Sequence, residues 1–536
     1  MKKLKLVCVA IAMAGAAPTF AGGLLTNTNQ HVAFNRMMSR EASIGIDGVY
    51  YNPAGVVFMG EGHHLAINWQ LAYQTRTINN DYSLFTNNVN NPITPRDFKG
   101  KAFAPVIPSF QYAYNKGKWS FQANFSLTGG GGKCTFDDGL GSFEKIVSET
   151  AIAACGLAGV VDQTLGNKLG QQGMEMFTSD QAFGKTGKYS FNSYMHGRQY
   201  YYGLSAGAAY KFCDNFSAFL GVRGVYALTN YYGYVENINV GNMPLYKVLD
   251  PTKENAANIE LSCDQTGVGF TPIIGVDYKT GRWNFSAKYE FKTRIRLKNK
   301  SVNQTPSIGN LPANLANQMT GILTDKFHNA GLPLEQAKQQ AENTTNAVLN
   351  DPTVGATMMG LKTQFDQKLN KAIGEYEDGK KIAGDIPGYL ALGIGYSPVD
   401  AVRVNVGFHW FDDKNATSYN NRNKELKRGT LEYNAGVEVD VNKKITLSTG
   451  WQNTNYGLSD EYMDDKSFVV GSNSAAIGGV YHINKKMDLN VAYFHTFYQH
   501  KKTSETVQLA ADKSIVYNSD YTRNNNVFAV GLDINF

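Results

Sequence analysis

Side chains alternate between apolar and polar along most of this chain, and this period of two constrains the fold more than any other feature. In the stretch Trp119–Thr128, WSFQANFSLT, every odd position is apolar and every even position is polar. Because successive side chains of a strand point to opposite faces, such a stretch is predicted to be a strand with one apolar and one polar face. The composition agrees, since 54 glycines, 31 tyrosines and 29 phenylalanines with only 18% charged residues are typical of a large β-structure.

About fourteen such segments are predicted. They lie near residues 64–78, 101–114, 118–128, 198–212, 216–231, 266–279, 283–298, 386–397, 401–411, 429–441, 444–453, 468–483, 487–499 and 523–536. Every second connection is short, and the short ones begin near Asn115, Cys213, Lys279, Ser397, Val441 and Asn484. Short turns at one end, long loops at the other and aromatic residues at strand ends favour a transmembrane β-barrel over a β-sandwich. The fold class is therefore all-β: an antiparallel barrel over residues 63–536, apolar toward lipid and polar toward the lumen.

The first residues indicate export. Lysines at positions 2, 3 and 5, an apolar run from Leu6 to Ala17 and the small-residue site ending at Ala21 predict a signal peptide over residues 1–21. After it we find no apolar run long enough to cross a bilayer as a helix. We therefore expect a monomeric barrel in the outer membrane of a Gram-negative bacterium, in contact with outer-membrane lipid and lipopolysaccharide. The scattered lysines and arginines, with a net charge of +6, give no nucleic-acid footprint.

Two long connections interrupt the strand pattern, at about 137–187 and 301–380. Apolar residues recur there at helical spacing, which predicts helical extracellular insertions outside the barrel mouth. Their apolar faces either pack on one another as a loop core or form an external landing site for a hydrophobic ligand.

Residues 22–62 are too irregular for a wall strand, and we expect them to fold into the lumen. This segment contains GVYYNPAGVVFM, from Gly48 to Met59. A mature N-terminus, this motif, a fourteen-strand pattern and helical outer loops together resemble the outer-membrane long-chain fatty acid transporter family, which includes fatty-acid and aromatic-hydrocarbon uptake barrels. The resemblance covers most of the mature chain in strand order, but its only residue-specific motif is Asn52-Pro53-Ala54.

The resemblance implies that residues 22–62 form a hatch that plugs the barrel and shifts when ligand binds. It also implies that the solute leaves sideways through a gap at a kinked third strand. Pro53 fixes its own backbone and restricts Asn52, so Asn52, Pro53 and Ala54 would anchor the hatch to the barrel base, or form an ordinary lead-in turn. The glycines Gly129, Gly130, Gly131 and Gly132 end the third predicted strand and would form the lateral gate, or a flexible start to the next loop.

Several cations are predicted to face the lumen and could bind an anionic head group: Arg223, Lys292, Arg294, Arg296 and Arg403. The alternative is that they pair with inward acids such as Glu290, Glu432 and Glu438. His409 and His482 are also expected to face inward as structural residues, and neither a cofactor nor a metal site is predicted. Of the cysteines outside the leader, a disulfide is expected among Cys134, Cys155 and Cys263, with Cys213 at the other end of the barrel.

The sequence thus predicts a non-enzymatic protein that takes up hydrophobic small molecules, long-chain fatty acids or similar compounds, across the outer membrane. An open, water-filled pore gives such a solute no favourable path, whereas a plugged barrel with an apolar pocket does. The alternatives are a passive porin with a charged constriction, a barrel enzyme, for which no convincing nucleophile, base and orienting group is found, and a surface adhesin. The identity of the solute and any energy coupling are open at this stage.

Overall fold

The computed structural model describes residues 24–171, 173–306, 310–510 and 513–536. Within them one antiparallel sheet closes on itself, because the first strand, β1, pairs with the last, β18, from His64 opposite Asn535 to Asp81 opposite Asn518. Three barrel strands are interrupted and carry two labels each, namely β8 with β9, β10 with β11 and β16 with β17. Because β6 is only a two-residue bridge, the wall has fourteen strands, as predicted. The strand bounds are β1 Gly62–Asp81, β2 Arg96–Lys116, β3 Trp119–Phe136, β4 Tyr189–Cys213, β5 Phe216–Val240, β6 Met243–Pro244, β7 Ile259–Thr280, β8 Trp283–Glu290, β9 Arg296–Gln304, β10 Lys381–Ala383, β11 Tyr389–Val399, β12 Val402–Phe411, β13 Thr430–Asn442, β14 Ile445–Asn455, β15 Ser472–Asn484, β16 Met487–Tyr498, β17 Lys501–Ala510 and β18 Lys513–Asn535.

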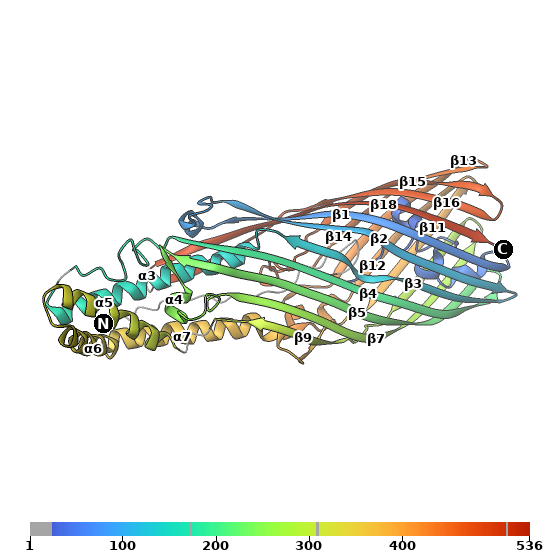
Figure 1. Ribbon diagram of the computed structural model, residues 1–536. Helices are drawn as coiled ribbons and strands as arrows, with labels where there is room; N and C mark the ends of the chain where they lie inside the picture. Colours follow the sequence, from blue (N-terminus) through green and yellow to red (C-terminus); the bar gives the residue numbers. More distant parts are fainter. Residues whose placement is uncertain (1–23, 172, 307–309, 511–512) are drawn as a thin grey trace.

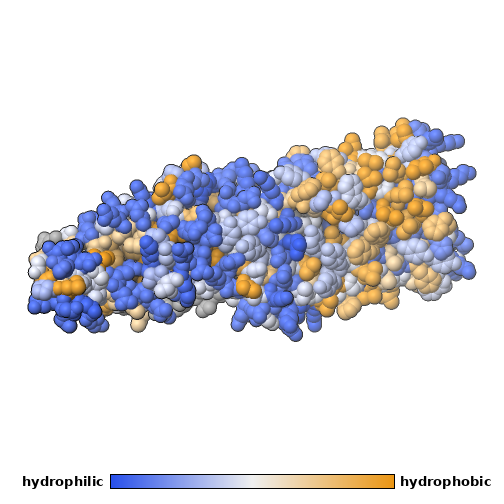
Figure 2. Space-filling model, in the orientation of Figure 1, coloured by the Kyte–Doolittle hydropathy of each residue, from blue (hydrophilic) through white to orange (hydrophobic). Residues whose placement is uncertain are grey.

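The outer face of the barrel carries an apolar band at the end where the short turns lie (Figures 1 and 2). Predicted outward residues are exposed there, including Trp119 at 47% and Phe528 at 53%. Apolar side chains facing out and polar side chains facing in reverse the arrangement of a water-soluble protein. This is the pattern of a barrel wall that contacts lipid.

Several strands continue well past the apolar band, so the barrel is taller than predicted. β4 and β5 have 25 residues each, and Figure 1 shows β1 to β5 and β7 running on toward a group of helices at the far end. The helices are α1 Val32–Met37, α2 Gly48–Tyr51, α3 Gly141–Leu169, α4 Tyr246–Leu249, α5 Leu311–Asn329, α6 Leu334–Leu349 and α7 Pro352–Ile373. Short 3₁₀ turns occur at η1 Gly55–Phe58, η2 Ser83–Asn87, η3 Gly374–Tyr376, η4 Asp413–Asn415 and η5 Tyr419–Glu425.

The helical insertions share one apolar core with the inner face of the strand extensions. Phe143 and Leu165 of α3, Met319 of α5 and Val348 of α6 are buried in the same cluster as Phe136 of β3. Packing of the insertions on one another is therefore present in the structure. The expectation that no segment could span a membrane as a helix was wrong for α3, which is long and apolar enough by length and composition alone. Half of its most apolar 18-residue stretch is buried inside the protein.

Candidate functional site

The described part of the predicted N-terminal hatch ends at Glu61, because Gly62 begins β1. This segment, Leu24–Glu61, is called the hatch here and occupies the lumen near the short turns. Almost every residue from Thr26 to Val57 is buried. Helix α1 lies against β13 to β16 and β18, and glycines on these strands leave room for it. A β-carbon added at Gly450 would lie 1.7 Å from the Met37 carbonyl oxygen, and one at Gly436 would lie 2.1 Å from it. The wall sequence thus fits the hatch backbone closely.

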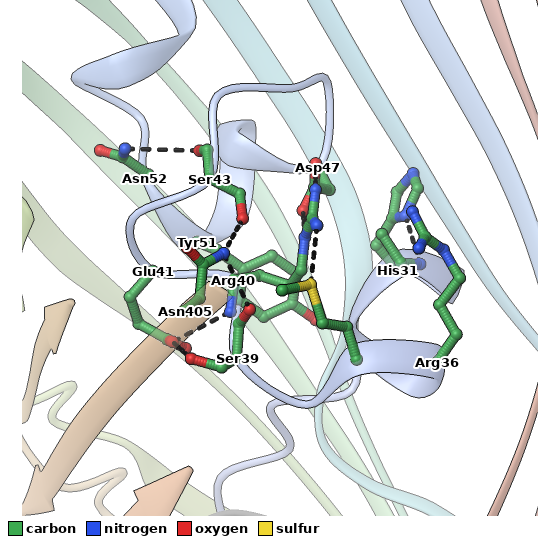
Figure 3. A network of polar contacts seen from close by, with 12 residues as sticks. His31, Arg36, Ser39, Arg40, Glu41, Ser43, Asp47, Tyr51, Asn52 and Asn405 are labelled. Atoms are coloured by element: carbon green, nitrogen blue, oxygen red, sulfur yellow. Dashed lines mark hydrogen bonds and ion pairs between the residues drawn. The ribbon is translucent and has the colours of Figure 1, made fainter. Parts of the chain in front are cut away.

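Polar and charged side chains join the hatch to the wall. Figure 3 shows those of the hatch together with Asn405 of β12, which donates to the Ser39 carbonyl and the Ser43 hydroxyl. Arg36 forms an ion pair with Glu438 of β13 and donates to the Ser448 hydroxyl over 2.9 Å. Arg40 pairs with Asp47 inside the hatch over 2.6 Å. Glu41 lies 2.8 Å from Nε2 of His409. The two pairs that cross to the wall are buried, so separating either one would leave an uncompensated charge, which opposes displacement of the hatch.

Each residue of the Asn52-Pro53-Ala54 motif contacts a different wall strand. Asn52 donates from Nδ2 to Oδ2 of Asp277 on β7 over 2.6 Å, and its Oδ1 accepts the Gly55 N–H over 3.1 Å. The carbonyl of Pro53 accepts from Gln122 of β3 over 2.7 Å. The carbonyl of Ala54 accepts from Ser217 of β5 over 2.7 Å. The turn fixes the end of the hatch to three strands at once.

The hydrogen-bond ladder between β2 and β3 is interrupted in the middle of the wall. Pairing passes directly from Phe103 opposite Lys133 to Phe110 opposite Phe125. Pro105 and Pro108 lie on the β2 side of this interruption and have no N–H to donate. On the β3 side, Gly130 and Gly131 have φ angles of 69° and 128°, which kink the strand. The predicted glycine run therefore lines a break in the wall, called the wall gap here: residues 104–109 and 126–132.

The first residues of the hatch take up hydrogen bonds that the wall gap leaves open. The Asn27 N–H donates to the Thr128 carbonyl over 2.9 Å, and Nε2 of Gln30 donates to the Leu127 carbonyl over 2.8 Å. From the other edge, Ser109 of β2 donates to the Gln30 carbonyl over 2.6 Å. Gln30 thereby bridges both edges of the gap, and on the β3 edge the carbonyls of Leu127 and Thr128 are satisfied by the hatch instead of by a neighbouring strand.

A cluster of buried apolar residues in the lumen connects the hatch with the wall gap. It is called the lumen cluster here and consists of Met38, Ala72, Ala104, Ile107, Leu127, Ala476, Phe494 and Val527, with Tyr200 and Tyr202 packed against it. Ile107 and Leu127 belong to the gap edges, whereas Met38 directly follows helix α1 of the hatch. Met38 has a φ of 58°, a left-handed conformation that is uncommon for a residue with a side chain.

The predicted lumen cations divide into two groups. Arg223 lies in the lumen, where it pairs with Glu290 over 2.6 Å, and Arg403 pairs with Glu438 over 2.7 Å. Arg403 also lines a cavity of about 630 Å³ at the short-turn end, together with Arg40 and Asn405. Both arginines thus have the acidic partners that the alternative interpretation named.

The inward orientation predicted for Lys292, Arg294 and Arg296 was wrong. The predicted strand 283–298 is interrupted between β8 and β9, and the alternation shifts there by one position. Ile295 and Leu297 occupy the buried face instead. Lys292 donates to the Asn415 carbonyl over 3.0 Å, Arg294 is exposed, and Arg296 pairs with Asp385 over 2.8 Å. A one-residue change in phase moves every following side chain to the opposite face.

The predicted disulfide is absent, because Cys134, Cys155, Cys213 and Cys263 are all free thiols. Cys134 and Cys263 pack in the apolar core, and the Cys155 thiol lies 3.4 Å from the Phe183 carbonyl. His409 is buried between Glu41 and Glu432, and His482 lies 2.7 Å from Asp488. In the described ranges, no group of three or more histidine, cysteine, aspartate or glutamate residues could hold a metal ion.

Sequence reasoning did not identify Asn27, Gln30 or Met38. Pro105 and Pro108 within a predicted strand were an available signal for the gap, since proline is confined to strand edges and irregularities. Nothing in the sequence reports which backbone groups the hatch would cover.

No protein-family model and no curated protein sequence matches this chain. Among solved structures, it is similar to the crystal structure of a Pseudomonas aeruginosa FadL homologue, with a TM-score of 0.57 and 13% identity over 96% of this chain and 100% of that one. It is also similar to a deletion mutant of the monoaromatic hydrocarbon channel TodX, with a TM-score of 0.50 and 12% identity over 94% and 98% of the two chains. The chain has the fold of these barrels, as the resemblance in its sequence predicted.

Proposed function

We propose that this protein takes up hydrophobic small molecules across the outer membrane of a Gram-negative bacterium. The solute enters the lumen cluster and leaves sideways through the wall gap into the lipid. The observation that carries this proposal is the interrupted β2–β3 ladder, which lies beside the lumen cluster and is covered by the hatch. The names of the similar structures, a FadL homologue and a monoaromatic hydrocarbon channel, agree with a hydrophobic solute.

The energetics favour a sideways exit for such a solute. Each buried methylene contributes about 0.8 kcal/mol, so an apolar molecule that crossed an aqueous compartment would lose most of what it gained in the lumen cluster. A path from the lumen cluster through the wall gap leads from one apolar medium to another. Ile107 and Leu127 line both the cluster and the gap, so contact with apolar side chains is continuous.

In this proposal the hatch opens the path by changing hydrogen-bond partners. A ligand in the lumen cluster competes with the Met38 side chain, whose left-handed backbone costs about 1–2 kcal/mol. Displacement of α1 withdraws Asn27 and Gln30 from the carbonyls of Thr128 and Leu127. The Asn52-Pro53-Ala54 turn stays attached to the wall and acts as the fixed end.

The proposal gives a role to each remaining part of the chain. Residues 1–21 act as the signal peptide and residues 22–62 as the hatch, with Gly129 to Gly132 as the lateral gate. The barrel is a monomer that contacts outer-membrane lipid and lipopolysaccharide with its apolar band. Arg223 and Arg403 stabilise the lumen through their acidic partners.

Conductance in planar bilayers separates this function from that of a passive porin. With the hatch filling the lumen, the pure protein should give no large steady channels, while proteoliposomes should accumulate a labelled hydrophobic solute such as oleate or toluene. Large steady conductance without solute accumulation would support the porin and refute the proposal.

A polar substitution in the wall gap tests the route. Ile107→Asn places an amide in the apolar path, and burying an unpaired amide costs about 1–3 kcal/mol, so uptake should fall about tenfold. Ile259→Asn is the matched control, because Ile259 is 5% exposed and Ile107 is 2% exposed, but Ile259 lies in the core of the strand extensions. Equal uptake by Ile107→Asn and the unmodified protein would contradict a path through the gap.

A further inference from the structure

Cations on the outer face of the barrel lie where the apolar band ends, on the side away from the short turns. On β7 the outward residues Phe270 and Val268 are 71% and 64% exposed, and the next outward position is Thr266. On β2 the outward Phe103 is 54% exposed, and the next outward position is Lys101. Figure 2 shows hydrophilic residues beyond the apolar band. Side chains at this edge lie at the height of the lipid head groups.

Two of these cations are directly opposite each other on neighbouring strands. Lys133 of β3 is paired with Arg198 of β4 in the strand register, and both lie on the outer face, since Cys134 beside them packs in the inner core. Lys133 is exposed, whereas Nε of Arg198 is buried and has no partner among the described residues. Lys101 of β2 is diagonal to Lys133, because Lys101 pairs with Thr135. Directly opposed side chains have β-carbons about 5 Å apart, and like charges there destabilise a sheet, so the arrangement favours a bound anion.

A second pair repeats this arrangement on β9 and β10. Lys298 is directly opposite Lys381, and both side chains are exposed. Lys300 follows on the same face of β9 and is also exposed. The two pairs are connected along the wall by residues that are opposite one another in successive strands, namely Arg198, Asn230 of β5, Asp264 of β7 and Lys300. The cations Lys101, Lys133, Arg198, Lys298, Lys300 and Lys381 are called the cation belt here.

The acids beside the cation belt have other partners. Asp97 lies 3.3 Å from Lys99. Asp264, opposite Lys300, accepts a hydrogen bond from Asn230 over 2.8 Å. Among the described residues, no member of the belt forms a salt bridge. The belt therefore carries a net positive charge on the lipid side of the wall.

We propose that the cation belt binds the phosphate groups of lipopolysaccharide, a phosphorylated glycolipid, while the acyl chains of this lipid lie on the apolar band. A phosphate monoester carries a charge of about −1.5 to −2 at pH 7, which matches an opposed pair of cations. Arg198 offers its guanidinium fork to the phosphate oxygens, and Lys133 adds a point charge. The inference rests on the proposed place in the outer membrane and names the residues that hold this one lipid.

The same site lies at the edge of the wall gap. The β2–β3 ladder stops at the pair of Phe103 and Lys133. A phosphate shared by Lys101 and Lys133 therefore joins β2 to β3 beside the break, where these strands lack hydrogen bonds to each other.

Lipid A with and without its phosphates tests the site. The purified barrel in a non-ionic detergent is titrated with bisphosphorylated and with dephosphorylated lipid A, and the two affinities are compared by thermophoresis. The intact protein should bind the phosphorylated lipid at least about tenfold more tightly, and Lys133→Gln combined with Arg198→Gln should remove most of this preference. Without lipid, this double variant should resist unfolding at least as well as the unmodified protein, because the opposed like charges are gone.

Lys116→Gln combined with Lys118→Gln is the matched control, because these exposed lysines lie at the β2–β3 turn, at the opposite end of the barrel. It should keep the preference for the phosphorylated lipid. Equal affinities of the intact protein for the two lipids, or an equal loss of preference in both double variants, would overturn the site. Inorganic phosphate or phosphatidylglycerol that binds as tightly as phosphorylated lipid A would do so too, because the glycolipid would then contribute nothing of its own.

Solute uptake into proteoliposomes without lipid A is measured separately. A barrel that binds phosphorylated lipid A but takes up no hydrophobic solute refutes only the proposed function. Uptake of the solute without a preference for phosphorylated lipid A refutes only the role of the cation belt.

Discussion

Single glycines in the wall decide whether the hatch can enter the barrel. We predict that Gly450→Val prevents α1 from seating, because its β-carbon would overlap the Met37 carbonyl oxygen at 1.7 Å. Overpacking of this kind typically costs about 1–3 kcal/mol. The hatch should then become accessible to protease from the short-turn side, and bilayer conductance should rise.

Gly224→Ala provides the matched control, since the nearest atom to a β-carbon there is 3.6 Å away. The hatch of this variant should resist protease as well as the hatch of the unmodified protein does. A Gly450→Val barrel with a fully protected hatch would show that the backbone contact has no role in seating.

Asp413 connects the start of the hatch to a loop and should make stability depend on pH. Its carboxylate accepts the N–H groups of Leu24 over 3.2 Å and Thr430 over 2.9 Å. Burial raises the pKa of Asp413 from 3.8 to about 6. Because the folded protein binds this proton more tightly than the unfolded chain, the stabilising contribution is complete below pH 3.8 and is lost as the pH rises through about 6.

The difference in unfolding free energy between the unmodified protein and Asp413→Asn isolates this group. A change in pKa of this size corresponds to about 3 kcal/mol, so the difference should fall by up to that amount between about pH 4 and about pH 7. Denaturant unfolding in detergent at several pH values measures it. A difference that is constant with pH would contradict the raised pKa.

At the scale of elements, the turn at Asn52 fixes one end of the hatch. Asn52→Ala removes the bond to Asp277 and leaves that carboxylate with one amide partner, Asn284 at 2.9 Å. We expect a loss of about 1–3 kcal/mol in unfolding free energy and faster hydrogen exchange over residues 48–58. Asn79→Ala breaks a comparable bond to Asp97 on exposed strands and should change neither quantity measurably. Unchanged exchange in Asn52→Ala would mean that the turn does not anchor the hatch.

The strand pattern was predictable wherever one face meets lipid, because there a shift of one residue would expose every polar side chain. Past the apolar band both faces of a strand carry polar and apolar residues. The strands predicted near 198–212 and 216–231 are therefore shorter than β4 and β5. The inward placement of Lys292, Arg294 and Arg296 failed for a related reason. Periodicity carried across 291–295 assumes a continuous strand, whereas β8 and β9 are separated there.

At the scale of the whole molecule, the sequence predicted a plugged barrel and located both the anchor turn and the glycine run. It did not predict that the first residues of the hatch would bond to the edges of the wall gap. That contact joins Asn27 and Gln30 to Leu127 and Ser109, residues from distant parts of the chain. Local patterns describe strands and turns, but they do not report such long-range backbone pairing.

The hatch and the wall gap can be tied together directly. Thr26 bridges Gly129 in antiparallel fashion, so Asn27 lies opposite Thr128. Opposed residues of this kind have α-carbons about 4.5–5.5 Å apart, which suits a disulfide. Asn27→Cys with Thr128→Cys, in a background where the four native thiols are replaced by serine, gives a reversible lock, and each single-cysteine variant serves as its control.

The decisive measurement is uptake of a labelled hydrophobic solute into proteoliposomes by this double-cysteine barrel, before and after reduction. Our account predicts that uptake by the oxidised protein falls at least about tenfold and returns when the disulfide is reduced, while the single-cysteine controls do not change. Equal uptake by the oxidised and reduced protein would contradict it, because the solute would then cross with the gap held shut.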